Sequence, residues 1–121
     1  MKAKVKDLIS LEIEDALENF YPADPNNFGT WVRMMIGPDD SVGAESFDVL
    51  ICTLTWLNTE YSERRIFWGK NMLILFRYDL DEIKLHISKY VQNLSGDDWG
   101  TLAQKLSKVG EWEFENYQIC K

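Results

Sequence analysis

The side chain best suited to acid, base or ligand chemistry in this chain is its single histidine, His86. A catalytic pair or a metal site on a helix needs a second suitable group three or four positions away, where Lys89 and Tyr90 stand. A lone histidine next to the apolar residue Ile87 is typical of the boundary between the buried and exposed faces of a helix. We therefore expect His86 to have no catalytic or metal-binding role.

Carboxylates occur in close groups at Asp39-Asp40, at Asp97-Asp98 and at the alternating glutamates 111, 113 and 115. Each group falls in an expected turn, helix start or alternating segment, where solvation and capping account for it. The chain also lacks a Gly-x-Ser-x-Gly sequence, a phosphate-binding glycine loop and a cluster of cysteine and histidine. The sequence therefore predicts a protein that is not an enzyme, with no catalytic residue, no metal and no cofactor.

The two cysteines, Cys52 and Cys120, lie far apart, and neither has metal-ligand spacing around it. Cys52 falls in an expected strand and Cys120 in the C-terminal tail. A cytoplasmic location argues against a disulfide between them, so we expect free thiols.

Charge is distributed unevenly along the chain, whose net charge is −7. Residues 1–6 hold three lysines, and residues 7–63 hold twelve acids with Arg33 as the only base. Residues 64–121 hold nine bases and eight acids. Such a field repels nucleic acid and attracts a basic partner, although an acidic surface also serves solubility alone.

The five tryptophans divide into two groups. Trp99, at helical spacing, and Trp112, in an alternating apolar pattern, are expected in the core. Trp31, Trp56 and Trp68 fall on the second face of the expected sheet or in irregular segments. Exposed aromatics in an acidic surround are typical of binding hot spots, and core packing is the alternative for each of them.

Hydrophobic periodicity predicts strands first and helices second. Period-two alternation indicates strands at 3–13 with a bulge at Asp7-Leu8, at 31–36, at 45–53 and at 71–78. The last is apolar on both faces, which favours the interior of the sheet. Residues 16–27 read as a surface loop, and the segment from 55 to 69 fits either a short helix or an irregular loop.

The hairpin formed by residues 31–36 and 45–53 has a predictable register. If Ile36 lies opposite Glu45, one face carries only apolar residues, namely Val32, Met34, Ile36, Phe47, Val49 and Ile51. The other face then places Arg33 opposite Asp48 as a cross-strand ion pair. A shift by one residue would mix the two sets, so burial selects the parity of this register.

Two amphipathic helices follow the strands. Asp79 with Glu82 matches an N-cap followed by an acid, and apolar residues then recur at helical spacing as far as Gly96. A second helix is expected from Asp97 to a stop at Gly110. The fold class is therefore α+β, with a mostly antiparallel sheet of about four strands in the order β-β-β-β-α-α. Both C-terminal helices are expected to pack on one face of the sheet, within a single domain spanning 1–121.

Neither a secretory signal nor a membrane span is expected. The first six residues alternate charged and apolar side chains, and the longest apolar run is the five residues from Met72 to Phe76. These features predict a cytoplasmic protein without a membrane partner.

The order and spacing of several segments carry a family resemblance. Gly43–Thr53, preceded by Ile36-Gly37-Pro38 and followed by Trp56-Leu57, resembles the bacterial immunity proteins of polymorphic, contact-dependent toxin systems, in particular the eighth immunity family. The matching positions are Gly37, Gly43, Glu45, Ser46, Phe47, Asp48, Cys52, Trp56, Trp99, Trp112, Phe114 and Tyr117. The resemblance implies a protein encoded beside a toxin that protects the producing cell by binding the toxin.

The sequence and the resemblance together predict a monomeric inhibitor whose partner is a cognate bacterial toxin domain. The toxin is expected to be a nuclease whose active cleft the inhibitor covers. The predicted partner-binding residues combine acids and aromatics: Asp39, Asp40, Glu45, Asp48, Trp31, Trp56, Tyr61 and Trp68. The alternative is a structural or adaptor module that assembles with itself or docks on a larger complex.

Overall fold

The structure, a computed structural model, describes residues 1–115. The expectations for Tyr117 and Cys120 lie outside these residues. The strands are β1 (Ala3–Ser10), β2 (Gly29–Pro38), β3 (Glu45–Thr53), β4 (Met72–Leu75) and β5 (Glu111–Trp112). The helices are α1 (Leu54–Tyr61), α2 (Leu80–Gln92) and α3 (Trp99–Leu106), with short 3-10 turns η1 (Leu17–Asn19) and η2 (Ser62–Arg64). The predicted α+β class is confirmed.

The sheet has the order β1-β2-β3-β4, and β5 pairs with β3 beside β4. β1 with β2, β2 with β3, and β3 with β5 are antiparallel, whereas β3 and β4 run parallel. Parallel neighbours need a crossover between them, and α1 with the loop after it provides that crossover. The segment from 55 to 69, which fits a helix or a loop by sequence, therefore contains both.

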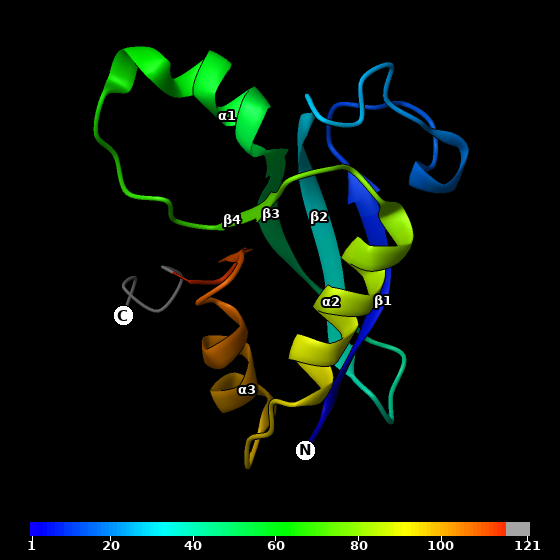
Figure 1. Cartoon of the computed structure of the whole chain (residues 1–121). Helices are drawn as coiled ribbons and strands as arrows, with labels where there is room; N and C mark the ends of the chain where they lie inside the picture. The colour runs from blue at the N-terminus through cyan, green and yellow to red at the C-terminus, as the bar shows by residue number, and fades with distance from the viewer. Residues whose placement is uncertain (116–121) are drawn as a thin grey trace.

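The predicted hairpin register is confirmed, with Ile36 opposite Glu45 and Arg33 opposite Asp48. The six side chains predicted for the core face are all buried: Val32, Met34, Ile36, Phe47, Val49 and Ile51. This face carries the main core because α2 and α3 cover it (Figure 1). Both C-terminal helices thus pack on one face, as expected.

Two strand predictions need correction. β1 ends at Ser10 instead of residue 13, because the Ser10 hydroxyl accepts hydrogen bonds from the backbone N–H groups of Glu12 and Ile13 and turns the chain. The predicted interior strand at 71–78 is only four residues long and lies at the edge of the sheet. Its apolar residues on both faces suggested burial, but Ile74 is 46% exposed and Phe76 83% exposed.

The helix starts follow the predicted capping chemistry. The Asp79 carboxylate accepts a hydrogen bond from the Glu82 N–H at 3.2 Å, and Asp98, one residue later than predicted, accepts one from the Thr101 N–H at 2.8 Å. α2 ends at Gln92, before the predicted stop at Gly96. No helix within residues 1–115 is long and apolar enough to cross a membrane.

Candidate functional site

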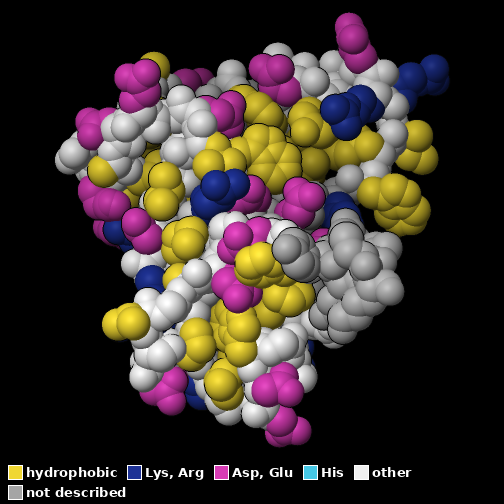
Figure 2. Space-filling view, turned by 180° about the vertical axis from the view of Figure 1, so that it is seen from behind, with side chains coloured by type: hydrophobic (Ala, Val, Ile, Leu, Met, Phe, Trp, Pro, Cys, Tyr) yellow, Lys and Arg dark blue, Asp and Glu magenta, His cyan; other side chains and the backbone are white. Residues whose placement is uncertain are grey.

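The structure divides the predicted partner-binding residues into three places along β3. Asp39 and Asp40 lie in the loop before β3, and the α1 side of the molecule, after β3, carries Trp56, Tyr61 and Trp68. Nine residues of strand separate these ends by about 30 Å. Between them lies the sheet face opposite α2 and α3, here called the open face, where hydrophobic side chains are interspersed with charged ones (Figure 2).

Arg33 and Asp48 form a bidentate ion pair on the open face. Arg33 Nε donates to Asp48 Oδ1 at 2.9 Å, and Arg33 Nη2 donates to Asp48 Oδ2 at 3.0 Å. Their side chains are 43% and 21% exposed. The hydrogen bond and the charge of Asp48 raise the pKa of Arg33 above its ordinary value. Asp48 is therefore bound to Arg33 within the sheet, and only a small part of its side chain is accessible to a partner.

Glu45 is also engaged within the fold. Its Oε1 accepts a hydrogen bond from Trp112 Nε1 at 2.8 Å. The ring of the same tryptophan stacks on Phe47 of β3, and the two ring centres are 6.2 Å apart. Glu113 Oε1 accepts from the Ser46 N–H at 2.6 Å. These contacts attach β5 to the start of β3, so the Glu45 carboxylate has a structural task whatever else it contacts.

The loop that carries Asp39 and Asp40 has basic side chains beside it in the folded protein, although the neighbouring sequence is acidic. Pairing of β1 with β2 brings the lysine-rich N-terminus beside it, with Lys4 opposite Gly37. The Asp39 N–H donates to the Lys2 carbonyl at 3.1 Å, and Lys6 Nζ donates to the Ser41 carbonyl. Both aspartates are exposed, but three lysines share their end of the molecule.

A stronger concentration of acid lies at residues 11–27, here called the acidic shoulder. It carries Glu12, Glu14, Asp15, Glu18 and Asp24, and its sequence contains no base. Lys84 of α2 lies beside it, with its Nζ 3.6 Å from Glu18 Oε1. Figure 2 shows acidic side chains along the margin of the open face away from the α1 side. This surface was not among the predicted site residues, although the run of acids without a base was visible in the sequence.

Trp56 has a packing role. The Thr53 hydroxyl accepts a hydrogen bond from the Trp56 N–H at 3.3 Å and caps α1, while the Phe28 N–H donates to the same hydroxyl at 3.0 Å. The Trp56 ring lies so close to Gly29 that a Cβ there would be 2.2 Å from a ring carbon. The ring thus fixes α1 against the start of β2.

The loop that returns from α1 to β4 exposes apolar and basic side chains together. Tyr61 packs on Phe67 with ring centres 5.0 Å apart, and the Arg64 guanidinium lies 4.3 Å from the Tyr61 ring centre. Beyond them Ile66 and Trp68 project into solvent. We call residues 64–77 the aromatic lip. The sequence indicated Tyr61 and Trp68 as partner contacts, but not Arg64, Ile66 or Phe67.

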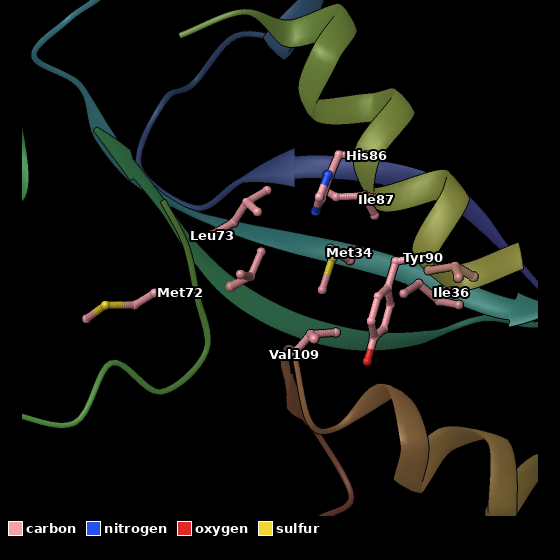
Figure 3. A pocket seen from close by; sticks show the side chains of 10 residues that line it. Met34, Ile36, Met72, Leu73, His86, Ile87, Tyr90 and Val109 are labelled. Carbon is pink, nitrogen blue, oxygen red and sulfur yellow. The ribbon is translucent and has the colours of Figure 1, made fainter. Parts of the chain in front are cut away.

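His86 lines a small apolar cavity between α2 and the core face (Figure 3). The cavity measures about 80 Å³, and Met34, Ile87 and Tyr90 also line it. An apolar space of this size accommodates only a few heavy atoms. Among residues 1–115 no group of three potential ligand side chains could hold a metal ion.

Comparison with known proteins gives one finding. The model of the family described as immunity protein 8 matches residues 4–117, which span the fold from β1 through β5. No curated protein and no solved structure matches the chain.

Proposed function

Because this chain belongs to the immunity protein 8 family, we propose that the toxin it neutralises is a nuclease and that it covers the active cleft of that toxin. The family match, which extends over almost the whole chain, supports neutralisation of a toxin, and the charge of the inhibitor supports the choice of a nuclease. Neutralisation of a toxin needs a complex and no turnover. Binding alone is therefore the activity that we assign to the protein.

Charge supports a nuclease as the partner. A cleft that binds a phosphate backbone is lined with bases, and the inhibitor has a net charge of −7. Asp39 and Asp40 are exposed and make no ion pair within the described residues. The acidic shoulder adds five more carboxylates, of which Glu18 pairs with Lys84 and Glu12 accepts a hydrogen bond from the Trp31 N–H. Complementary charge speeds association, while apolar contacts on the open face slow dissociation.

Charge reversal of free carboxylates tests the proposal. Asp39→Lys with Asp40→Lys, and separately Glu14→Lys, should slow association with the neighbouring gene's toxin domain about fivefold or more at low salt. Glu45 is left unchanged, because reversing it would break the hydrogen bond from Trp112.

The matched control reverses Asp81 and Asp97, which are also exposed and lie on the helical side of the protein. It should bind within twofold of the wild-type rate. Equal rates for all these variants would contradict recognition of a basic cleft by the acidic surface.

A further inference from the structure

We infer that the aromatic lip attaches the inhibitor to its toxin outside the nucleic-acid cleft, at an apolar recess bordered by carboxylates. The inference rests on the proposed function, because the partner is the same toxin domain. The inhibitor would then contact the toxin through two regions of opposite charge, the acidic surface and the basic lip.

Exposure of large apolar side chains is the first observation. Ile66 is 88% exposed, Trp68 93% and Phe76 83%. Ile74 in β4 lies opposite Cys52 in the parallel register, so its side chain emerges on the open face. Scattered apolar residues are normal on a surface, but several large ones within one short segment indicate an interaction site.

The charge of the lip determines what can cover it. Residues 64–77 include the bases Arg64, Arg65, Lys70 and Arg77 and no acid, in a chain whose net charge is −7. A cleft that binds phosphates would repel these four charges, whereas carboxylates would complement them. Two lips facing each other across a two-fold axis would bring eight bases together, so a second copy of the chain is a poor occupant.

A hollow beside the lip has the same chemistry. It measures about 390 Å³ between α1 and the returning loop, and its walls include Leu54, Leu57, Tyr61, Phe67 and Arg65. An apolar side chain fits such walls, and Arg65 is placed to meet a carboxylate next to it. Figure 2 shows hydrophobic and basic side chains together at the margin on the α1 side.

The lip is held in place before it meets a partner. Arg65 has φ 62°, and the Ile66 N–H donates to the Arg64 carbonyl at 2.5 Å, which defines a tight γ-turn. Asn71, at the other end of the loop, has φ 57°, and its carbonyl accepts from the Leu50 N–H at 2.8 Å. Because both ends of the loop are fixed, binding has to order only the short segment between them, which favours slow dissociation.

The dimensions allow one toxin domain to reach both charged regions. The lip and the loop with Asp39 lie at opposite ends of β3, about 30 Å apart, and a small domain is about that wide. The toxin would then lie along the open face, with its cleft toward the acids and its carboxylate-bordered recess on the lip.

Binding kinetics with a catalytically inactive form of the toxin domain encoded beside this gene test the inference. Trp68→Ala should speed dissociation about 30-fold, as expected for loss of a hot-spot aromatic. The control Leu85→Ser changes a residue on α2 that is 57% exposed and should stay within twofold. Trp68→Ala behaving like Leu85→Ser would overturn the inference.

The sign of the charge effect gives a second, independent readout. The double variant Arg64→Glu, Arg65→Glu should associate about tenfold more slowly if the toxin surface is acidic, and faster if that surface is basic. Arg65→Gly removes one charge at a position whose φ of 62° glycine adopts without strain, so this variant should also associate more slowly than the wild type. Faster association of the double variant would overturn the inference.

Failure of the lip and failure of the proposed function give different results. If the wild type binds the toxin and the lip variants bind it equally well, only the role of the lip is refuted. If the wild type does not bind the toxin at all, the toxin assignment is refuted as well. Vesicles containing 30% phosphatidylglycerol and sedimentation of the free protein complete the test. Vesicle binding or self-association that Trp68→Ala abolishes, with toxin binding unchanged, would assign the lip to a membrane or a second copy instead.

Discussion

Gly29→Ala is expected to destabilise the protein by displacing Trp56. The added Cβ would lie 2.2, 2.4 and 2.6 Å from three carbons of the Trp56 ring, whereas carbon atoms in contact lie about 3.5–4.0 Å apart. The ring must therefore retreat by about 1 Å or more, although the capped start of α1 resists the movement. Overpacking of this kind costs about 2–3 kcal/mol, which corresponds to a fall in Tm of roughly 6–12 °C.

Urea and thermal unfolding followed by circular dichroism measure this effect. Gly43→Ala is the matched control, because a Cβ at Gly43 meets nothing within 4 Å and should change the free energy of unfolding by less than about 0.5 kcal/mol. Trp56→Ala alone should cost about 2–3 kcal/mol through lost packing of a half-buried ring.

The double variant supplies the decisive comparison. Once Trp56 is alanine, the methyl group at position 29 has room, so Gly29→Ala, Trp56→Ala should be about as stable as Trp56→Ala alone. Strictly additive costs for the two substitutions would refute the packing argument, and so would a neutral Gly29→Ala. Because α1 supports the aromatic lip, Gly29→Ala should also bind the toxin domain more weakly.

Three further predictions concern Asp48, His86 and Cys52. Asp48→Ala should lower the free energy of unfolding by about 1–2 kcal/mol, since it leaves a half-exposed Arg33 unpaired; a normal melt with collapsed toxin affinity would instead make Asp48 a toxin contact. His86→Gln should unfold within about 1 kcal/mol of wild type and still protect cells that express the toxin, and loss of protection by a folded variant would reopen a functional role for His86. Burial raises the pKa of Cys52 from 9.0 to about 11, so its contribution to stability is complete below pH 9 and is lost as the pH rises toward 11. Cys52→Ala should weaken this alkaline loss of stability in pH-dependent urea melts, and an unchanged pH profile would contradict it.

The hairpin register could be predicted because it depends on local parity. A shift of β2 against β3 by one residue would separate the six apolar residues onto two faces, whereas the observed parity places them on one face and sets Arg33 opposite Asp48. The helix starts were predictable for a similar reason, because the capping aspartates lie next to the helices that they cap.

Contacts between distant segments were not predictable in the same way. The approach of Trp56 to Gly29 depends on how α1 leaves the sheet, and the lysines beside Asp39 reach it only through pairing of β1 with β2. The apolar residues of 71–78 resemble an interior strand, because composition does not specify whether another strand lies beyond them. The aromatic lip follows from that edge position, so the sequence indicated only Trp68.

We propose that the protein neutralises a nuclease toxin by forming a stoichiometric complex. Titration of the inhibitor into the toxin at a concentration well above Kd, with cleavage of a labelled nucleic acid as the readout, tests it most directly. Nuclease activity should fall linearly to zero at one inhibitor per toxin, and it should return when the complex is denatured and the toxin is refolded alone. Complete inhibition at a small fraction of one equivalent, or no inhibition at excess, would contradict it.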